Sequence, residues 1–366
     1  MICDWGRVSV PMVLAWGLFT AGLQAVETAE QTVIVSAEKI WERAHHSAFT
    51  DLIRYDGDLY CAFREGSGHI PGLNGTIRVI RSRDGHAWQS VALLDEAHVD
   101  LRDPKLSIMP NGRLMLNMGA SYYHGRRREK IESRVCFGGK NEQGELTFGP
   151  LKKVVFPERL LTGTDWLWRV TWHKGVAYGC LQQVPKDSPR ALHLISSEDG
   201  VAWKHVATLD VPDANETTLR FAADDTLIAM IRRDASDKPS VGHVGMARPP
   251  YTEWKINASN KPFGGPNFVQ LPGGRWLAGS RGFSVADPRN RSQRDTFTEL
   301  WWLDPKTAQV REIVRLPSKG DTSYPGFVID EAAGRVYVSY YSGDHEAKAT
   351  IHLATLRLDA LLKGPE

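Results

Sequence analysis

The chain has 366 residues, of which 42% are hydrophobic and 24% are charged, with 33 glycines and 20 prolines. This is the composition of an ordinary globular protein with enough chain to bury a large core. The formal net charge of +2 produces no strong field that would attract nucleic acid or a membrane surface, so we expect no nucleic acid partner and no stable membrane association.

The first residues have the pattern of an export signal. Arg7 ends a short polar start, the stretch from Val8 to Leu23 is almost entirely apolar, and cleavage after Ala25 fits the small residues there. The apolar stretch is short for a membrane span, so a retained anchor is the weaker alternative. We therefore predict a signal peptide over residues 1–25, a domain over residues 26–366, and a secreted or periplasmic location.

The cysteines do not form a pattern that binds a metal. Cys3 lies in the expected signal peptide, and Cys61, Cys136 and Cys180 lie in apolar, strand-like segments. Buried free thiols are the favoured interpretation, and a single disulfide is the alternative. No Cys/His spacing is typical of zinc, so we expect neither a metal nor a cofactor.

Internal repeats dominate the rest of the sequence. Six segments each contain an apolar strand, a tight turn with Gly or Asp, and a second apolar strand, which is the pattern of a β-hairpin. Six sheets arranged around an axis would protect their edges, whereas a β-sandwich, the competing fold, would not explain six matched hairpins. We therefore predict an all-β, six-bladed β-propeller with four strands in each blade. The hairpins span residues 48–63, 104–118, 167–181, 218–231, 267–279 and 324–340.

The two ends of the chain are expected to meet. The last unit offers a third strand from Ile351 to Leu358 and little beyond it, while the segment from Thr32 to Ile40 precedes the first hairpin and has a strand pattern. We predict that this N-terminal segment supplies the outer strand of the sixth blade and so closes the ring.

Two turns have closely related sequences. Residues 82–88 read Ser-Arg-Asp-Gly-His-Ala-Trp, and residues 197–203 read Ser-Glu-Asp-Gly-Val-Ala-Trp. Ser and Asp can bind the backbone of the turn, Gly allows positive φ, and Trp packs back on the blade. Both turns resemble a short form of the Asp-box, or BNR repeat, of the sialidase (neuraminidase) superfamily. That motif is peripheral, so it indicates the fold more than the catalytic residues.

The resemblance to sialidases extends over the rest of the chain. In that family a Glu opens an inner strand and an Arg ends the next strand, as Glu216 and Arg232 do here. The family also has a Tyr at the start of the last blade, which matches Tyr324, and an Arg in the fifth blade, which matches Arg294 or its rival Arg291. The resemblance implies a Tyr324 nucleophile, a Glu216 base, and an arginine clamp on the sugar carboxylate.

The sequence departs from the family at two points. The Arg-Ile-Pro motif of the first inner strand is replaced by Ala48-Phe49-Thr50, and the loop of residues 64–75, where sialidases have an acidic Asp, contains no Asp. The candidates for the missing acid are Glu65, His69 and Asp103. These changes widen the expected substrates from sialic acid to related ulosonic or uronic acids.

Further candidates for substrate binding lie at or near the ends of the expected inner strands. Arg64 is the candidate to replace the lost arginine, and a tryptophan at such a position can serve as a platform for a sugar ring. Charged groups at these places favour a site, because the core of a propeller would otherwise be apolar there. The remaining candidates are Arg102, Trp168, Arg169, Asn267 and Arg281.

Each of these residues also has a structural interpretation. Tyr324 could be an aromatic residue that only packs near the axis, and Glu216 with Arg232 could be an ion pair between neighbouring strands. Asp103 could cap a turn before a proline, and His69 could be an ordinary loop histidine.

The function that this pattern predicts is an exo-acting glycoside hydrolase that releases an acidic sugar from a glycan. One alternative is a non-catalytic carbohydrate-binding propeller, which needs the arginines and tryptophans but no nucleophile. Another is a polysaccharide lyase that uses Tyr and His as base and acid. The presence of both Tyr324 and Glu216 favours the hydrolase over the binding protein, and the missing Asp favours the two alternatives.

Overall fold

The computed structural model describes residues 1, 33–70, 75–183, 190–234, 240–285, 294–343 and 348–363. The expected signal peptide lies outside the described residues, apart from Met1. No helix in the described part of the chain is long and apolar enough to cross a membrane.

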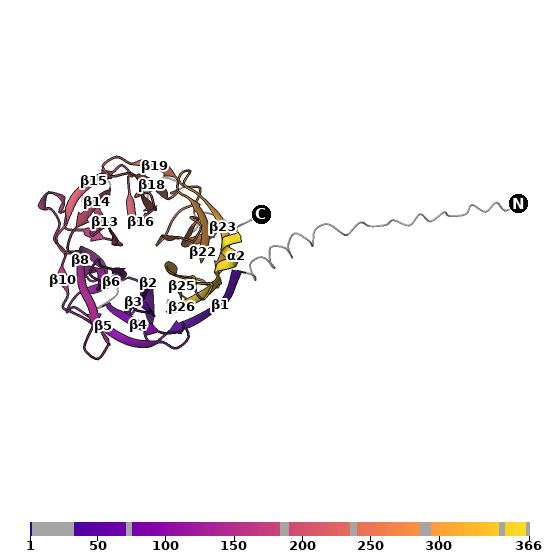
Figure 1. Ribbon diagram of the computed structural model, residues 1–366, viewed down its shortest axis with the longest axis horizontal. Coiled ribbons are helices and arrows are strands. Elements are labelled where there is room, and N and C mark those ends of the chain that lie inside the picture. The colour runs from indigo at the N-terminus through magenta and orange to yellow at the C-terminus, as the bar shows by residue number, and fades with distance from the viewer. Residues whose placement is uncertain are drawn as a thin grey trace.

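The chain is an all-β propeller, with sheets arranged radially around a central axis (Figure 1). Two sheets have four strands each. One contains β16 (Ala214–Phe221), β17 (Leu227–Arg233), β18 (His243–Ala247) and β19 (Lys255–Ala258). The other contains β20 (Asn267–Gln270), β21 (Trp276–Val285), β22 (Arg294–Asp304) and β23 (Gln309–Leu316).

Two further sheets have five strands each, because each gains one short additional strand. One contains β6 (Asp100–Ile108), β7 (Leu114–His124), β8 (Arg127–Lys140), β9 (Leu146–Phe148) and β10 (Lys152–Lys153). The other contains β11 (Asp165–Leu167), β12 (Thr171–His173), β13 (Val176–Gln183), β14 (Ala191–Ser197) and β15 (Lys204–Leu209). The third inner strand is thus divided into β11 and β12, with Trp168 and Arg169 in the break between them.

The first and last units of the chain share one eight-stranded sheet. It contains β1 (Ile34–Trp41), β2 (His46–Tyr55), β3 (Asp58–Gly66), β4 (Thr76–Ser82), β5 (Gln89–Leu94), β24 (Thr322–Asp330), β25 (Arg335–Gly343) and β26 (Ala349–Arg357). A single parallel pair, His46 with Ala349, joins β2 to β26. The expectation of six separate four-stranded sheets is therefore corrected, since hydrogen bonds divide the described strands into five sheets. A 3-10 helix, η1 (Glu158–Leu160), and α2 (Leu358–Lys363) complete the fold.

All six expected hairpins are present as antiparallel strand pairs, namely β2–β3, β6–β7, β12–β13, β16–β17, β20–β21 and β24–β25. The N-terminal strand β1 pairs antiparallel with β26, as predicted, with Lys39 opposite His352. This pairing joins the two ends of the described chain and leaves the long strand β26 without a free edge there.

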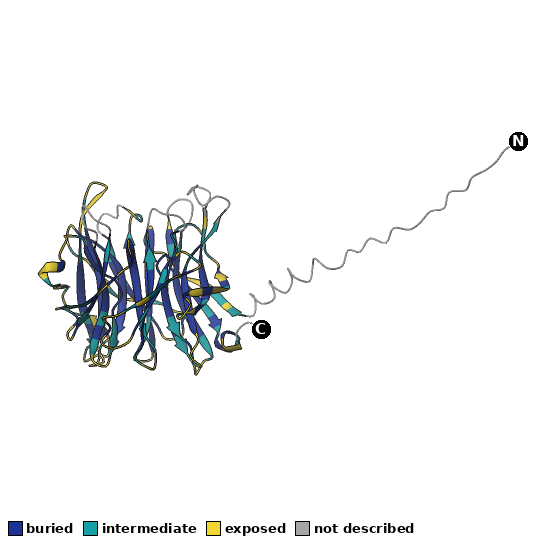
Figure 2. Cartoon of the chain, turned by 90° about the horizontal axis from the view of Figure 1, so that it is seen from above, coloured by how far each residue is buried: buried dark blue, intermediate teal, exposed yellow. Residues whose placement is uncertain are grey.

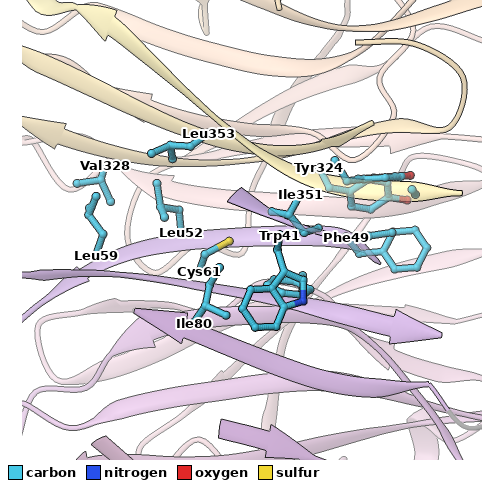
Figure 3. Close-up of a cluster of buried hydrophobic side chains, with 14 of the residues drawn as sticks. Trp41, Phe49, Leu52, Leu59, Cys61, Ile80, Tyr324, Val328, Ile351 and Leu353 are labelled. Carbon is cyan, nitrogen blue, oxygen red and sulfur yellow. The ribbon is translucent and has the colours of Figure 1, made fainter. Parts of the chain in front are cut away.

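Apolar side chains fill the space between neighbouring sheets, while the exposed residues gather in the loops at both ends of the strands (Figure 2). The core of the eight-stranded sheet includes Leu52, Cys61, Val328 and Leu353 (Figure 3). All three described cysteines are free and buried. Burial raises the pKa of the Cys61 thiol, so this side chain is an unreactive part of the core.

The two turns with related sequences also have the same hydrogen bonds. In the first, the Asp84 carboxylate accepts bonds from the backbone N–H groups of two following residues, and the Trp88 indole donates to the Gly85 carbonyl at 2.9 Å. Asp199 and Trp203 make the equivalent bonds in the second turn. The Trp254 indole donates to a carbonyl three residues earlier in the same way, although sequence reasoning did not detect that third turn.

Candidate active site

Four inner strands contain an irregularity in their pairing close to their first residues, in β2, β6, β16 and β24. Such a bulge adds a residue to one strand and redirects its side chain. The residues at these points include Phe49, Asp103, Glu216 and Tyr324. Phe49, Asp103 and Tyr324 have positive φ angles of 65°, 54° and 57°. Residues with a side chain rarely adopt this conformation, and it is often found at functional sites.

Tyr324 and Glu216 are in direct contact, although 108 residues separate them in the chain. The Tyr324 hydroxyl donates to Glu216 Oε1 at 2.5 Å, and the two residues are 6% and 3% exposed. The second carboxylate oxygen accepts bonds from Arg232 Nη1 at 2.9 Å and from the Gly265 N–H at 2.8 Å. These bonds fix the carboxylate in an orientation that can receive the phenolic proton.

The environment makes this phenol difficult to ionise without help. Burial, and then the negative charge of Glu216, raise the pKa of Tyr324 well above its ordinary value, while Arg232 lowers it. Burial opposes the charge of Arg232, but Glu216 and Tyr324 raise the pKa of its guanidinium. Arg232 therefore remains a cation beside the Tyr324–Glu216 pair.

Arg232 is held so that part of its guanidinium remains available. Its Nε donates to Asp234 Oδ1 at 2.9 Å, and its Nη1 lies 3.4 Å from the Tyr324 hydroxyl. Within the described residues Nη2 makes no hydrogen bond, and the side chain is 21% exposed. This free edge could bind a carboxylate of a substrate.

Arg281 approaches Tyr324 from a different sheet. Its Nη2 donates to Asp321 Oδ1 at 3.1 Å and to the Tyr341 hydroxyl at 2.9 Å, and its Nε donates to the Thr322 carbonyl at 2.8 Å. Its guanidinium carbon is 6.0 Å from the centre of the Tyr324 ring. The structure therefore brings Arg281 to the site together with Arg232. Arg291 and the side chain of Arg294 lie outside the described part of the chain.

Asp103 is the acid candidate that is electrostatically coupled to the Tyr324–Glu216 pair. Burial raises the pKa of its carboxyl; the cations of Arg102 and Lys105 lower it, and the charge of Glu216 raises it further. Asp103 Oδ2 accepts a bond from Arg102 Nε at 3.0 Å. A buried carboxyl with a raised pKa can retain the proton that a leaving oxygen needs.

Two other candidates are engaged in structural contacts away from this pair. Both oxygens of Glu65 are occupied, by the Trp41 indole at 2.6 Å and by Arg78 at 2.9 Å. Arg64 is fully buried and donates to Asp100 at 2.7 Å. The structure brings neither Glu65 nor Arg64 into contact with Tyr324, because both belong to β3 rather than to the loop that follows it.

His69 reaches the site through a residue that sequence reasoning missed. Its Nδ1 lies 2.5 Å from Asp321 Oδ2, and its ring centre is 5.1 Å from that of Phe49. The side chain is 41% exposed. Asp321 therefore joins the exposed His69 to Arg281, which places this histidine at the edge of the site.

His46, His69 and Asp321 have donor atoms within 4.8 Å of one another, so they form a group that could hold a metal ion. However, Arg281 binds the same carboxylate of Asp321 and would repel a cation. His46 Nδ1 is also buried without a partner, whereas a metal-bound histidine normally donates from its second nitrogen. A hydrogen-bonded His–Asp pair fits these contacts better than a metal site.

The remaining candidates are buried and make packing or hydrogen-bond contacts within the protein. The Trp168 ring centre is 5.7 Å from that of Tyr324, but the residue is only 2% exposed, so it packs instead of presenting an open platform. Arg169 Nη1 binds both oxygens of Asp51 at 2.8 Å. Asn267 Nδ2 donates to the Pro325 carbonyl at 2.8 Å, which holds the residue that follows Tyr324.

Lys105 is a buried cation that sequence reasoning overlooked. It is 1% exposed, its Nζ lies 4.5 Å from the Trp168 ring centre and 5.7 Å from that of Tyr324, and it donates to the Pro104 carbonyl at 3.1 Å. Burial, and then the charge of Arg169, lower its pKa to about 8. The available signal was a lysine on an expected inner strand, directly before Leu106, at a kind of position where lysine is rarely buried.

The lowered pKa of Lys105 predicts a specific dependence of stability on pH. Between about pH 8 and the ordinary lysine value of 10.5, the unfolded chain binds a proton that the folded chain lacks, so the free energy of unfolding rises with pH in this window. We expect wild type to gain roughly 3 kcal/mol relative to Lys105→Met between pH 7 and pH 10.5. Urea denaturation of both proteins across this range measures the difference. A difference that stays constant with pH would show that this amine does not titrate there.

Several solved structures share this fold. A protein of unknown function from Dyadobacter fermentans is 16% identical, with a TM-score of 0.73 over 88% of this chain and 98% of its own. Trypanosoma rangeli sialidase is 14% identical, with a TM-score of 0.69 over 87% of this chain and 56% of its own. Penicillium chrysogenum alpha-L-arabinanase, complexed with arabinobiose, is 11% identical, with a TM-score of 0.61 over 89% of this chain and 99% of its own.

No protein-family model and no curated protein matches the sequence. At these low identities the structural comparisons establish the propeller fold, which hosts unrelated functions. The chain also spans little more than half the length of the T. rangeli sialidase. Any function must therefore be argued from the residues of the site.

Proposed function

We propose that this protein is an exo-acting glycoside hydrolase that releases an acidic sugar, in the manner of a sialidase, from the end of a glycan. One observation carries the proposal: the 2.5 Å contact between the Tyr324 hydroxyl and Glu216, beside Arg232. A phenol, a carboxylate base and cations with free donor edges are the groups that this reaction needs.

In the first step, Tyr324 Oη attacks the anomeric carbon while the bond from that carbon to the leaving oxygen breaks. Glu216 takes the phenolic proton, and a protonated acid gives its proton to the leaving oxygen. In the second step, water replaces the Tyr324 oxygen at the same carbon. The acid residue takes a proton from that water, and Glu216 returns its proton to the phenolate. Two displacements leave the configuration of the sugar unchanged.

An acidic sugar explains why a tyrosine would replace the usual carboxylate nucleophile. The carboxylate of the sugar would repel an attacking Asp or Glu, whereas a phenol is neutral until Glu216 removes its proton. Arg232 and Arg281 approach Tyr324 from two sheets and can hold the substrate carboxylate between them. In T. rangeli sialidase, 2,3-difluorosialic acid is bound as a covalent intermediate.

Asp103 is the proposed acid. Its burial and raised pKa suit a proton donor, and its charge acts on the pKa of Tyr324. His69, oriented by Asp321, is the second candidate.

We infer that the whole chain folds as six repeating units, with the first and last sharing a sheet, and that its two matched turns are Asp-boxes. We also infer that residues 1–25 direct the domain to a secreted or periplasmic location, where it would meet glycans.

A panel of umbelliferyl glycosides tests the proposed reaction. We expect wild type to release the fluorophore from a glycoside of sialic acid, of a 3-deoxy ulosonic acid or of a uronic acid, and not from neutral galactose, because only an acidic sugar pairs with Arg232 and Arg281. Binding of the free acidic sugars without hydrolysis would support the carbohydrate-binding propeller. Appearance of an unsaturated product from an acidic polysaccharide would support the lyase.

A further inference from the structure

A wide groove of about 1300 Å³ lies between two neighbouring sheets, β16–β19 and β20–β23. Turns that contain Asp224, Trp254, Arg275 and Lys306 line this groove. Glu216 lies near the start of β16, whereas Asp224 lies in the turn beyond its other end, so about five extended residues, or roughly 17 Å, separate Glu216 from that turn. The groove is therefore distinct from the candidate active site.

Three tryptophans line this groove, at positions 254, 276 and 302. The Trp254 indole donates to the Tyr251 carbonyl at 3.0 Å, which fixes its ring. Trp276 is almost buried, with its ring centre 5.3 Å from that of Phe268. Trp302 is half-buried in a strand of the sheet. Trp254 and Trp302 are partly exposed, and rigid aromatic faces of this kind bind the apolar faces of sugar rings.

Five cations and three carboxylates line the groove, so positive charge is in excess, and the carboxylates belong to Asp224, Glu253 and Asp304. Arg248 is paired with Asp224 at 2.7 Å, and Asp304 accepts bonds from residues of its own turn. Four exposed cations have no carboxylate partner within salt-bridge distance among the described residues. They are Lys255, Arg275, Lys306 and Arg311.

Arg275 and Trp302 lie close together in the groove. The Arg275 guanidinium carbon lies 5.5 Å from the centre of the Trp302 ring, so a sugar bound there would meet both an aromatic face and a charge-assisted donor. We propose that this groove is a second, non-catalytic binding site for an acidic oligosaccharide. It would hold a chain of sugars that carry carboxylates, on the opposite side of the ring of sheets from Tyr324.

This inference goes beyond the proposed hydrolysis and does not depend on it. The groove needs no nucleophile, and its residues make no contact with Tyr324 or Glu216 among the described contacts. Binding to the groove should therefore survive changes at the active site, and hydrolysis of a small glycoside should survive changes in the groove.

Biolayer interferometry with immobilised polygalacturonate oligosaccharides tests the proposal, with neutral dextran as the reference surface. We expect the double variant Arg275→Glu/Arg311→Glu to bind about tenfold or more weakly than wild type, since two charge-assisted contacts are lost. Trp302→Ala should also weaken binding, and Trp302→Phe should restore most of it. Arg83→Glu/Lys204→Glu, two exposed changes in other units, controls for the same change in net charge.

Other results would argue against a binding site for acidic oligosaccharides in the groove. Equal binding by wild type and the double variant, or equal binding of dextran and polygalacturonate, would overturn the proposal. A change of oligomeric state in the double variant, seen by analytical ultracentrifugation, would instead make the groove a contact between copies of the chain. The double variant should hydrolyse a small umbelliferyl glycoside at the wild-type rate, so failure of the groove and failure of the hydrolase proposal are distinguishable. These binding measurements test the groove even if the protein hydrolyses no glycoside.

Discussion

Replacing Tyr324 by Phe is expected to reduce hydrolysis of an umbelliferyl glycoside by about a thousandfold, which corresponds to about 4 kcal/mol in the activation barrier. The change removes one oxygen, while the ring keeps its contacts with Phe49 and Trp168, at 5.2 and 5.7 Å between ring centres. Steady-state kinetics on the best substrate of the panel measures the loss, and it should appear in kcat.

Stability needs a separate control, because the change also removes a buried hydrogen bond. Loss of the phenol leaves Glu216 Oε1 without this partner, and an unsatisfied buried group costs about 1–3 kcal/mol. Tyr340→Phe is a matched control, since its buried hydroxyl donates to the Pro317 carbonyl at 2.9 Å. It should lower the melting temperature without changing kcat. If the Tyr324 variant kept most of its rate, an acid–base mechanism with His69 and Asp103 would become the better mechanism.

Replacing Arg232 is expected to have the second large effect, on recognition of the sugar carboxylate. Arg232→Lys keeps a positive charge near Glu216 but loses the planar fork, so binding of the acidic sugar should weaken by about 2–3 kcal/mol. The methyl ester of the same sugar offers no carboxylate and should be affected far less. Isothermal titration calorimetry with both ligands measures the difference.

The controls for this arginine follow from its neighbours. Arg232→Ala would leave Glu216 Oε2 without its cation and so would disturb the base as well as the clamp. Arg233→Ala changes the adjacent arginine, which donates to the Pro212 carbonyl instead, and should leave sugar binding unchanged. Equal losses for the acid and its ester would exclude a carboxylate clamp at Arg232.

The hairpins could be predicted from the sequence because their signals are local. Turn residues such as Asp56-Gly57 and Lys174-Gly175 lie between apolar strands, and positive φ occurs at these positions in the structure. The number of sheets could not be predicted in the same way. It depends on one bridge, His46 with Ala349, between residues from opposite ends of the chain.

The site could be predicted only in part, and for the same reason. The positions of Glu216 and Tyr324 came from a family resemblance, since no spacing rule connects residues 108 positions apart. Asp321 and Lys105 were missed because their roles arise from contacts between sheets, with His69 and Trp168. The prediction for Glu65 placed it in a loop, whereas strand β3 continues through that residue.

Trapping the covalent intermediate tests the central claim most directly. A 2,3-difluoro derivative of the acidic sugar that proves to be the substrate should react with wild type, as 2,3-difluorosialic acid does with T. rangeli sialidase. Peptide mass spectrometry should then find the mass of the sugar on Tyr324, and the Tyr324→Phe protein should remain unlabelled. A sugar attached to any other residue, or equal labelling of the Phe variant, would contradict the assignment of Tyr324 as the nucleophile.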